Sequence, residues 1–334
     1  MLPFCFALPE FAKDRDDALT RFQALTLDSH YKGEGSIARV VAATCPTSGK
    51  RFAAKRVSLP RESQERSQVL QRVARESAVA QALATQQPFP EGLVRHHACV
   101  YDDAANTVIF IMQLCEGPNL AELRRQQQEA RGRLPEARVK HIVRQVAAAL
   151  GQLHRLGFLC VDLKAENVVI APTEQDPDRV LLADFDLCRD LPGSGSSTCA
   201  DMLAKLDPAA AALSGPARDA SERVWGTAEY LAYELLKDGP LAYSAASDWW
   251  ALGVLTYELL YGRAPYSAPT LDGVLHRITH YSPAFTPPED GGPKVSGAMV
   301  QFIRALLRHR PDMRLGARGG MQEVLGHPGL QQGV

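Results

Sequence analysis

The densest group of chemically capable side chains lies in one short segment, Cys160-Val161-Asp162-Leu163-Lys164-Ala165-Glu166-Asn167-Val168-Val169-Ile170. An acid, a base and an amide follow one another at spacings of two and three residues between apolar stretches, a pattern unusual for a structural loop. Asp162 can accept the proton of a hydroxyl group, and Lys164 can neutralise a phosphoryl group during its transfer. The segment therefore indicates phosphoryl transfer.

A further carboxylate follows the apolar stretch 180–183, in the string Asp184-Phe185-Asp186. A carboxylate at the end of such a strand, paired with the amide of Asn167, suits Mg²⁺, which takes few protein oxygens and adds phosphate oxygens. We therefore expect Asn167 and Asp184 to hold the metal ion.

Lys55 lies on an otherwise apolar strand, and its plainest interpretation is an exposed lysine. Glu76 favours another interpretation, because it falls on the apolar face of a helix predicted over 66–84. That face is formed by Val69, Val73, Ala80 and Leu83. A buried carboxylate is costly unless a cation meets it. We therefore expect Lys55 to pair with Glu76 and to be held in place to bind phosphate.

A glycine loop, Gly33-Glu34-Gly35-Ser36-Ile37-Ala38, precedes these residues. Alone it fits a tight hairpin. A dinucleotide fingerprint would lead into a helix, whereas Arg39-Val40-Val41 continues as a strand. A glycine loop between two strands instead allows backbone N–H groups to cover phosphates, so Gly33, Glu34 and Gly35 are candidate nucleotide contacts.

The elements that must position these residues change character along the chain. Hairpins are predicted from SIARVVAAT with RFAAKRV and from HACVY with TVIFIMQL, whereas the pattern after CEGPN is helical, with short strands at 159–161, 168–171 and 180–183. This succession suggests a small strand-rich lobe, a larger helical lobe and a cleft between them. Residues 1–27 have no sustained period and read as an extension or a loosely docked helix. The Ser-, Gly-, Ala- and Pro-rich stretch 190–222 reads as a mobile insertion.

Composition excludes several classes of protein. The 334 residues carry a net charge of −1, so there is no global field for nucleic acid or an anionic membrane. Seven scattered cysteines without a Cys-x-x-Cys pair argue for a reducing compartment, with neither a disulfide framework nor a zinc site. The N-terminus lacks the basic leader of a secretory signal, and the stretch from Asp248 to Gly262 is too short and too charged to span a membrane. We expect a cytoplasmic protein, with peripheral membrane association and nuclear entry left open.

Taken in order, these motifs resemble the eukaryotic protein kinases over about residues 28–330. The resemblance implies a bilobal α+β fold with a β-rich N-lobe (28–112), a hinge (113–119) and a helical C-lobe (120–330). It also implies an ATP- and Mg²⁺-dependent enzyme that acts on protein substrates, with Asp162 as the catalytic base. Asn167 and Asp184 would be its metal ligands.

The resemblance assigns further residues to the nucleotide. Val40, Ala53 and Val169 would sandwich the adenine, Met112 would lie at the back of its pocket, and Gln113 to Cys115 would form the hinge contacts. The string Asp-Leu-Lys-Ala-Glu-Asn is the form found in serine/threonine kinases. The stretch from Gly226 to Glu234 is similar to the AGC group. Asp-Phe-Asp and the long insertion are similar to its phototropin- and PINOID-like branch in plants and green algae.

The chain also departs from the pattern of this family. Ala38 replaces the third glycine of the loop, Tyr233 replaces the proline of Ala-Pro-Glu, and Asn119 replaces a glutamate that reads ribose and a substrate arginine. Glu166 and Glu258 remain at the other two positions that read arginine. We therefore expect a weakened preference for basic peptide substrates. In the family, Glu234 and Arg314 form a structural ion pair.

Regulation is expected to differ as well. Val161 stands where the family has an arginine that binds a phosphate on the activation segment, and Arg223 stands at the usual AGC phosphoacceptor. We therefore expect a non-RD kinase that is not switched on through that site. The alternatives are a pseudokinase that binds ATP or acts as a scaffold, and, more remotely, a small-molecule phosphotransferase of the same fold.

Overall fold

The computed structural model describes residues 6–7, 15–34, 38–127, 133–192, 198–206, 224, 226–286 and 291–331. These residues form two compact units. The first contains the described residues up to Pro90, Val94–Cys115 and helix α5 (Thr198–Leu206). The second contains Glu91–Leu93 and the described residues from Glu116 to 192 and from 224 onward. The first is built on a sheet and the second on helices, as predicted for the two lobes.

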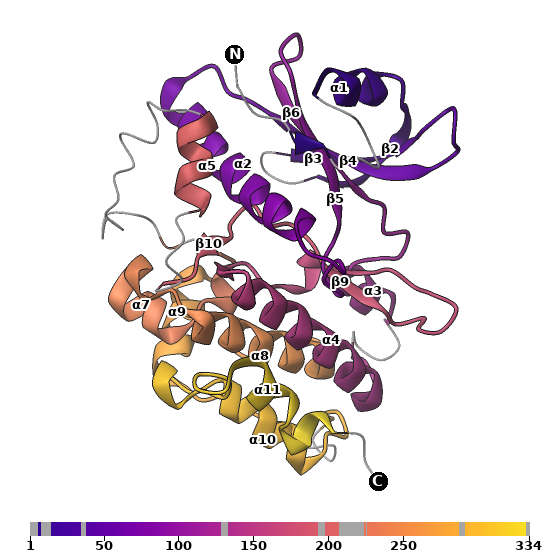
Figure 1. The fold of residues 1–334 in the computed structure, drawn as a ribbon. Coiled ribbons are helices and arrows are strands. Elements are labelled where there is room, and N and C mark those ends of the chain that lie inside the picture. Colours follow the sequence, from indigo (N-terminus) through magenta and orange to yellow (C-terminus); the bar gives the residue numbers. More distant parts are fainter. Residues whose placement is uncertain are drawn as a thin grey trace. The chain divides into compact units, whose positions relative to one another are not determined.

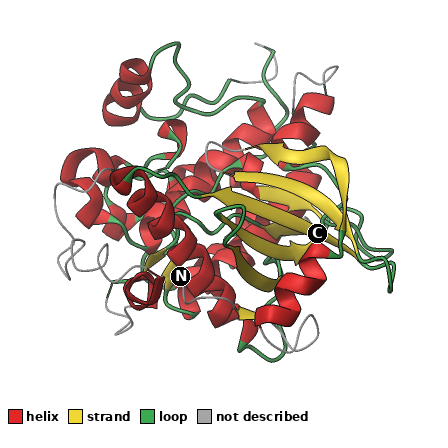
Figure 2. Ribbon diagram, turned by 90° about the horizontal axis from the view of Figure 1, so that it is seen from above, coloured by secondary structure: helices red, strands yellow, loops and turns green. Residues whose placement is uncertain are grey.

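The first unit is built on an antiparallel sheet of six strands, in the order β1-β5-β6-β4-β3-β2. Figure 1 labels the strands, and Figure 2 shows the sheet in yellow. Its strands are β1 (Phe6–Ala7), β2 (Thr26–Glu34), β3 (Ala38–Thr44), β4 (Arg51–Ser58), β5 (His96–Asp102) and β6 (Thr107–Gln113). Both predicted hairpins are confirmed, since β3 pairs with β4 and β5 pairs with β6.

One face of this sheet buries an apolar cluster. The cluster comprises Val41, Ala43, Phe52, Ala54, Ala98, Val100, Ile109 and Ile111, together with Phe22 and Leu25. Phe22 belongs to helix α1 (Arg15–Gln23), which contacts β5. Part of the predicted N-terminal extension is therefore integral to this unit: it supplies β1, α1 and the first residues of β2.

Helix α2 (Ser63–Ala84) carries Glu76 and begins three residues earlier than the predicted start at 66. Val69, Val73, Glu76, Ala80 and Leu83 are all buried, which confirms the predicted stripe. These residues recur every three or four positions, as expected for a helix that packs along one side.

The second unit is mainly helical and contains two small sheets, β7 with β10 and β8 with β9. Its strands are β7 (Phe158–Leu159), β8 (Val168–Ile170), β9 (Val180–Leu182) and β10 (Arg189–Asp190). Its α-helices are α3 (Leu120–Gln126), α4 (Glu136–Arg155), α7 (Tyr233–Asp238), α8 (Ala245–Tyr261), α9 (Leu271–His280), α10 (Gly297–Leu306) and α11 (Gly320–Leu325). Short 3₁₀ turns are η1 (Ala165–Asn167), η2 (Ala228–Tyr230), η3 (Gly239–Ala242), η5 (Pro311–Met313) and η6 (Pro328–Leu330).

Helix α8 covers most of the stretch predicted as a buried apolar helix, and nearly all its residues are buried. It contacts α4 and α10. Among the described helices, none combines the length and the apolar composition that a membrane crossing requires.

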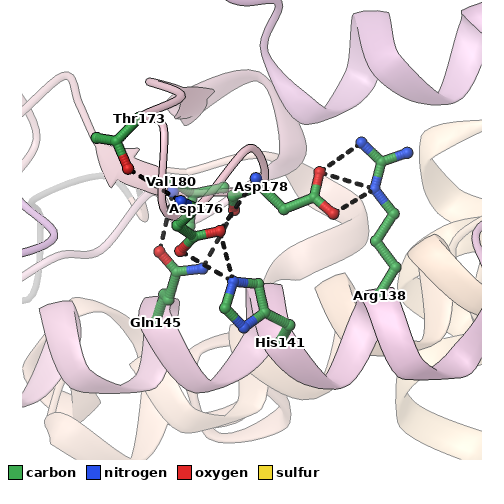
Figure 3. Close-up of polar contacts among 7 residues, drawn as sticks. All are labelled: Arg138, His141, Gln145, Thr173, Asp176, Asp178 and Val180. Carbon is green, nitrogen blue, oxygen red and sulfur yellow. Dashed lines mark hydrogen bonds and ion pairs between the residues drawn. The ribbon is translucent and has the colours of Figure 1, made fainter.

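The hairpin of β8 and β9 is anchored on α4 by a polar network (Figure 3). Arg138 binds the carboxylate of Asp178 at 2.6–3.0 Å, and His141 Nε2 lies 2.8 Å from Asp176 Oδ1. The amide of Gln145 donates to the carbonyl of Asp178 and accepts from the backbone N–H of Val180. These contacts fix the loop that joins β8 to β9 on α4, and the hairpin is thereby held in position.

Part of the stretch predicted as a mobile insertion forms a helix. Residues 198–206 form α5, whose Met202, Leu203 and Leu206 are buried. These buried side chains belong to a helix that contacts α2. Residues 193–197 and 207–223 lie outside the described residues.

Candidate active site

Lys55 and Glu76 meet in the first unit. The Nζ atom of Lys55 lies 2.7 Å from Oε2 of Glu76, and both side chains are buried. Lys55 comes from β4 and Glu76 from α2, so a strand and a helix each supply one charge. A buried charge without a partner is costly. The two groups therefore stay together, and each holds the other in place.

His96 on β5 is a second partner of Glu76. Its Nε2 atom lies 3.2 Å from Oε1 of Glu76, and its ring packs edge-on against Phe110. Both oxygens of the carboxylate are therefore engaged, one by Lys55 and the other by His96. No sequence motif marks His96, and its place at the start of a buried strand was the available signal.

Four of the expected nucleotide contacts share one face of the sheet. In the strand register, Val40 lies opposite Lys55 and Ala53 lies opposite Met112. Since side chains on a strand alternate between faces, Ala53 and Lys55 lie on the same face. This face is the one opposite the apolar cluster of Ala54 and its neighbours.

The other residues expected to contact the nucleotide lie at the glycine loop, after β6 and on β8. Gly33 and Glu34 end β2, opposite Val40 and Arg39, so the glycine loop does connect two strands. Gly35 lies outside the described residues. Gln113 ends β6 and Cys115 follows it, both half-buried, whereas Val169 lies on β8 in the second unit.

Asp162 is held by groups on both of its carboxylate oxygens. Lys164 Nζ lies 2.7 Å from Oδ2, and Asn167 Nδ2 donates to the Asp162 carbonyl and, at 3.3 Å, to Oδ2. The backbone N–H and the hydroxyl of Thr227 both lie 3.1 Å from Oδ1. The structure thus brings together Asp162, Lys164 and Asn167, and adds Thr227, which the sequence indicated only as part of the AGC-like stretch from Gly226 to Glu234.

The electrostatics of Lys164 favour its charged form. Burial alone would lower the pKa of this ammonium group, but the hydrogen bond and the negative charge of Asp162 outweigh burial and raise it. Lys164 therefore carries a positive charge beside Asp162 at neutral pH, as neutralisation of a phosphoryl group requires.

Asn167 and Asp184 flank the paired ends of β8 and β9. Val168 lies opposite Leu182, and the N–H of Ala183 donates to the carbonyl of Asn167 at 2.8 Å. Asp184 follows Ala183 directly, is exposed and has a φ of 63°. The amide nitrogen of Asn167 is committed to Asp162, so its oxygen is the atom that can ligate. A carboxylate and an amide oxygen fit a Mg²⁺ ion that completes its shell with other oxygens.

Asp248 on α8 fixes the backbone just before Asp162. Its two carboxylate oxygens accept from the N–H groups of Cys160 and Val161, each at 2.9 Å, and His154 Nε2 lies 2.8 Å away. Val161 has a φ of 69°, a conformation that costs a β-branched residue about 1–3 kcal/mol. The hydrogen bonds to Asp248 hold this strained backbone in place.

The segment from Gly226 to Tyr230 is tied down by contacts that involve no phosphate. Besides the bonds from Thr227, the N–H of Ala165 donates to the Tyr230 hydroxyl at 3.3 Å. That hydroxyl donates to Oε2 of Glu258, whose Oε1 binds Arg124. Burial raises the pKa of Tyr230, so its phenol remains the donor. Glu258, expected to read a substrate arginine, already has an arginine of this chain as partner.

Two of the departures have structural consequences. The Asn119 side chain caps α3, since it accepts from the N–H of Glu122 at 2.8 Å while Glu122 accepts from the N–H of Asn119. The ring of Tyr233, at the start of α7, stacks on His309 with centroids 4.4 Å apart.

The structural ion pair expected between Glu234 and Arg314 is confirmed. Arg314 binds both oxygens of Glu234, at 2.8 and 2.7 Å, and both side chains are buried. The guanidinium also donates to the carbonyls of Ala246 and Arg308, which satisfies its remaining N–H groups. This pair supports the fold of the helical unit.

Comparisons with known proteins agree with this geometry. A family model described as protein kinase domain matches residues 29–328. Protein kinase PINOID of Oryza sativa subsp. japonica is 33% identical over 293 residues, which cover 80% of this chain and 57% of the relative. Serine/threonine-protein kinase nrc-2 of Neurospora crassa is 29% identical over 303 residues, which cover 89% and 45%.

A solved structure, that of Rad53 1-466 in complex with AMP-PNP, matches with a TM-score of 0.66 and 25% identity over 93% of this chain and 66% of that one. The chain spans about half the length of the curated relatives it matches. The matches to PINOID and to WAG1 of Arabidopsis thaliana confirm the predicted resemblance to the PINOID-like branch of the AGC group.

Proposed function

The chain belongs to the protein kinase family, and from this premise we propose that it transfers the γ-phosphoryl group of ATP to serine and threonine hydroxyls of proteins. The observation that carries the proposal is the set of contacts around Asp162. Lys164, Asn167 and Thr227 hold its carboxylate. Asp248 fixes the backbone just before it, because its carboxylate accepts from the N–H of Cys160.

Asp162 acts as the base in this proposal. Its carboxylate orients the substrate hydroxyl and accepts its proton as the oxygen attacks the γ-phosphorus. Because Thr227 and Lys164 hold one oxygen each, the carboxylate keeps one orientation, which lowers the entropic part of the barrier. Lys164 neutralises the negative charge on the phosphoryl group as it moves.

The nucleotide is held by charge and by the metal. Lys55, kept in position by Glu76, binds the phosphates, and the backbone of Gly33, Glu34 and Gly35 covers them. Asn167 and Asp184 would hold Mg²⁺, which supplies charge neutralisation between the phosphates when it is bound.

Apolar residues receive the adenine. By resemblance, Val40, Ala53 and Val169 enclose it, Met112 lies behind it, and Gln113 and Cys115 belong to the hinge. Support comes from the register, which aligns Val40, Ala53 and Met112 with Lys55 on one face of the sheet.

In this proposal the substrate is a segment of a protein, and the enzyme has only a weak preference for basic residues in that segment. Glu166 is exposed and can meet an arginine of the substrate. Glu258 is engaged by Arg124 and Tyr230, so its contribution to reading a substrate arginine is reduced. We further propose non-RD regulation, because Val161 cannot bind a phosphate and other contacts hold the segment 226–230. Arg223, at the usual phosphoacceptor position, and Ser221, the candidate for a shifted phosphoacceptor, lie outside the described residues.

The deciding experiment is incubation of purified protein with radiolabelled ATP and a protein substrate, beside an Asp184→Ala variant. Glu174→Ala is the matched control, because it removes an exposed carboxylate from the hairpin that precedes Asp184. Label on serine and threonine that disappears only in Asp184→Ala supports the kinase. ATP binding without any transfer supports the pseudokinase, and transfer only to small molecules supports a phosphotransferase of another class.

A further inference from the structure

Helix α5 has one apolar side. Cys199, Met202, Leu203 and Leu206 follow one another at the spacing of a single helix face, and Asp201, Ala204 and Lys205 are exposed on the other. Met202, Leu203 and Leu206 are only 2%, 7% and 4% exposed. Isolated helices shorter than about 12–15 residues are marginal in water, so this helix of nine residues depends on what it packs against.

The partner of α5 is α2. The two helices contact each other within the first unit and lie side by side in Figure 1. The described residues that precede and follow α5 in the chain belong to the second unit. A segment of the second unit's chain therefore contributes a helix to the first.

The face of α2 opposite the sheet is buried as well. Glu76 and Ser77 mark the side toward the sheet, since they contact Lys55 and Cys99. At about 100° per residue, Ala74 and Ala78 point roughly 110° and 150° away from that side. They are nevertheless only 1% and 0% exposed. Their small side chains leave room for the larger apolar side chains of another helix.

We propose that this outer face of α2, marked by Ala74 and Ala78, is an internal docking surface for α5, and that docked α5 holds α2 where Glu76 meets Lys55. α2 is then fixed on both sides, by the sheet and by α5. Through its contact with α2, helix α5 thereby supports the ion pair of Lys55 and Glu76. The consequence for catalysis rests on the proposed kinase function, whereas the docking itself does not.

The test compares Leu203→Asp with Ala204→Asp. Both introduce the same charge into α5 at neighbouring positions, but only Leu203 belongs to the buried side. Hydrogen exchange should be about tenfold faster in α2 for Leu203→Asp and unchanged for Ala204→Asp, with β3 to β6 protected in both. A second variant, in which nine Gly and Ser residues replace 198–206, should reproduce the Leu203→Asp result.

Kinetics test the coupling to Glu76. We expect kcat/KM for ATP to fall about tenfold in Leu203→Asp and to stay within about twofold of the native value in Ala204→Asp. Equal exchange of α2 in both variants overturns the docking. Faster exchange with unchanged or increased kcat/KM overturns the coupling. Native protein without any transfer activity overturns the proposed function alone, because the exchange measurement needs no turnover.

Discussion

The Nε2 atom of His96 lies 3.2 Å from Oε1 of Glu76, on the carboxylate oxygen that Lys55 does not occupy. Both side chains are only 1% exposed. A carboxylate can only accept, so the N–H at Nε2 of His96 is the donor. Glu76 is therefore oriented from two strands at once, β4 through Lys55 and β5 through His96.

His96→Leu keeps an apolar side chain of similar size but removes this donor. A buried acceptor that loses its partner costs about 1–3 kcal/mol, so the free energy of unfolding should fall by that amount. The kcat/KM for ATP should fall as well, because Glu76 is less well oriented toward Lys55. Denaturant unfolding and steady-state kinetics measure the two effects. His97→Leu is the control, since His97 packs edge-on against Phe52; equal kinetic losses in both variants would contradict a positioning role for His96.

Lys55→Met should abolish phosphoryl transfer and leave the fold nearly intact. The variant removes the cation that we propose binds phosphate, while His96 still donates to Glu76. Transfer of radiolabel and the circular dichroism spectrum test the two parts. Lys50→Met, at an exposed turn of the same hairpin, should keep full activity. Undiminished transfer in Lys55→Met would overturn the assignment of the lysine.

Asp186→Gly should raise the affinity for inhibitors that require Phe185 to swing out of its buried position. Phe185 is buried and Asp184 has a φ of 63°. Glycine visits φ > 0 at little cost, whereas aspartate does not, so Asp186 should favour the orientation in which Asp184 would hold the proposed metal ion. Asp186→Ala is the matched control, because it removes the charge without adding glycine's freedom. Inhibitor affinities measured by titration that are the same in all three proteins would count against this explanation.

Treatment with phosphatase should leave basal activity largely unchanged. Val161 offers no cation to a phosphate, and the segment that follows the insertion is held by Thr227 on Asp162 and by Tyr230 on Glu258. Activity assays before and after treatment, with mass spectrometry of the protein, test this. A large loss of activity that maps to dephosphorylation of Ser221 would show that a shifted phosphoacceptor operates.

Arg124→Ala should strengthen the preference for arginine in peptide substrates. It removes the guanidinium that binds Oε1 of Glu258, so the carboxylate can meet a substrate cation instead. Burial lowers the pKa of Arg124, in keeping with a partly desolvated site. A peptide library should show increased selection for arginine, whereas Arg125→Ala, at an exposed neighbour, should not. No change in selection would mean that Glu258 does not read the substrate.

The sequence by itself determined the two hairpins, the helix with Glu76 on its apolar stripe and the order of the chemical groups. Alternation in strands and the helical period fix which side chains share a face, so the pairing of Lys55 with Glu76 followed from local patterns and the cost of a buried charge. The placement of Asn167 and Asp184 agrees with two short strands, since Asn167 directly precedes Val168 of β8 and Asp184 comes two residues after Leu182, the partner of Val168 on β9.

Only the tertiary structure decided the partners that come from distant segments. His96, Thr227 and Asp248 meet the site from elements whose own patterns say nothing about what they contact. Composition predicted a mobile insertion, and within it residues 198–206 form α5, whose contact with α2 local sequence cannot reveal. Arg124 and Glu258 stand 134 residues apart, and the packing of the helical unit brings them together. Periodicity specifies which faces are apolar, whereas the choice of partner for each face depends on the packing of the whole chain.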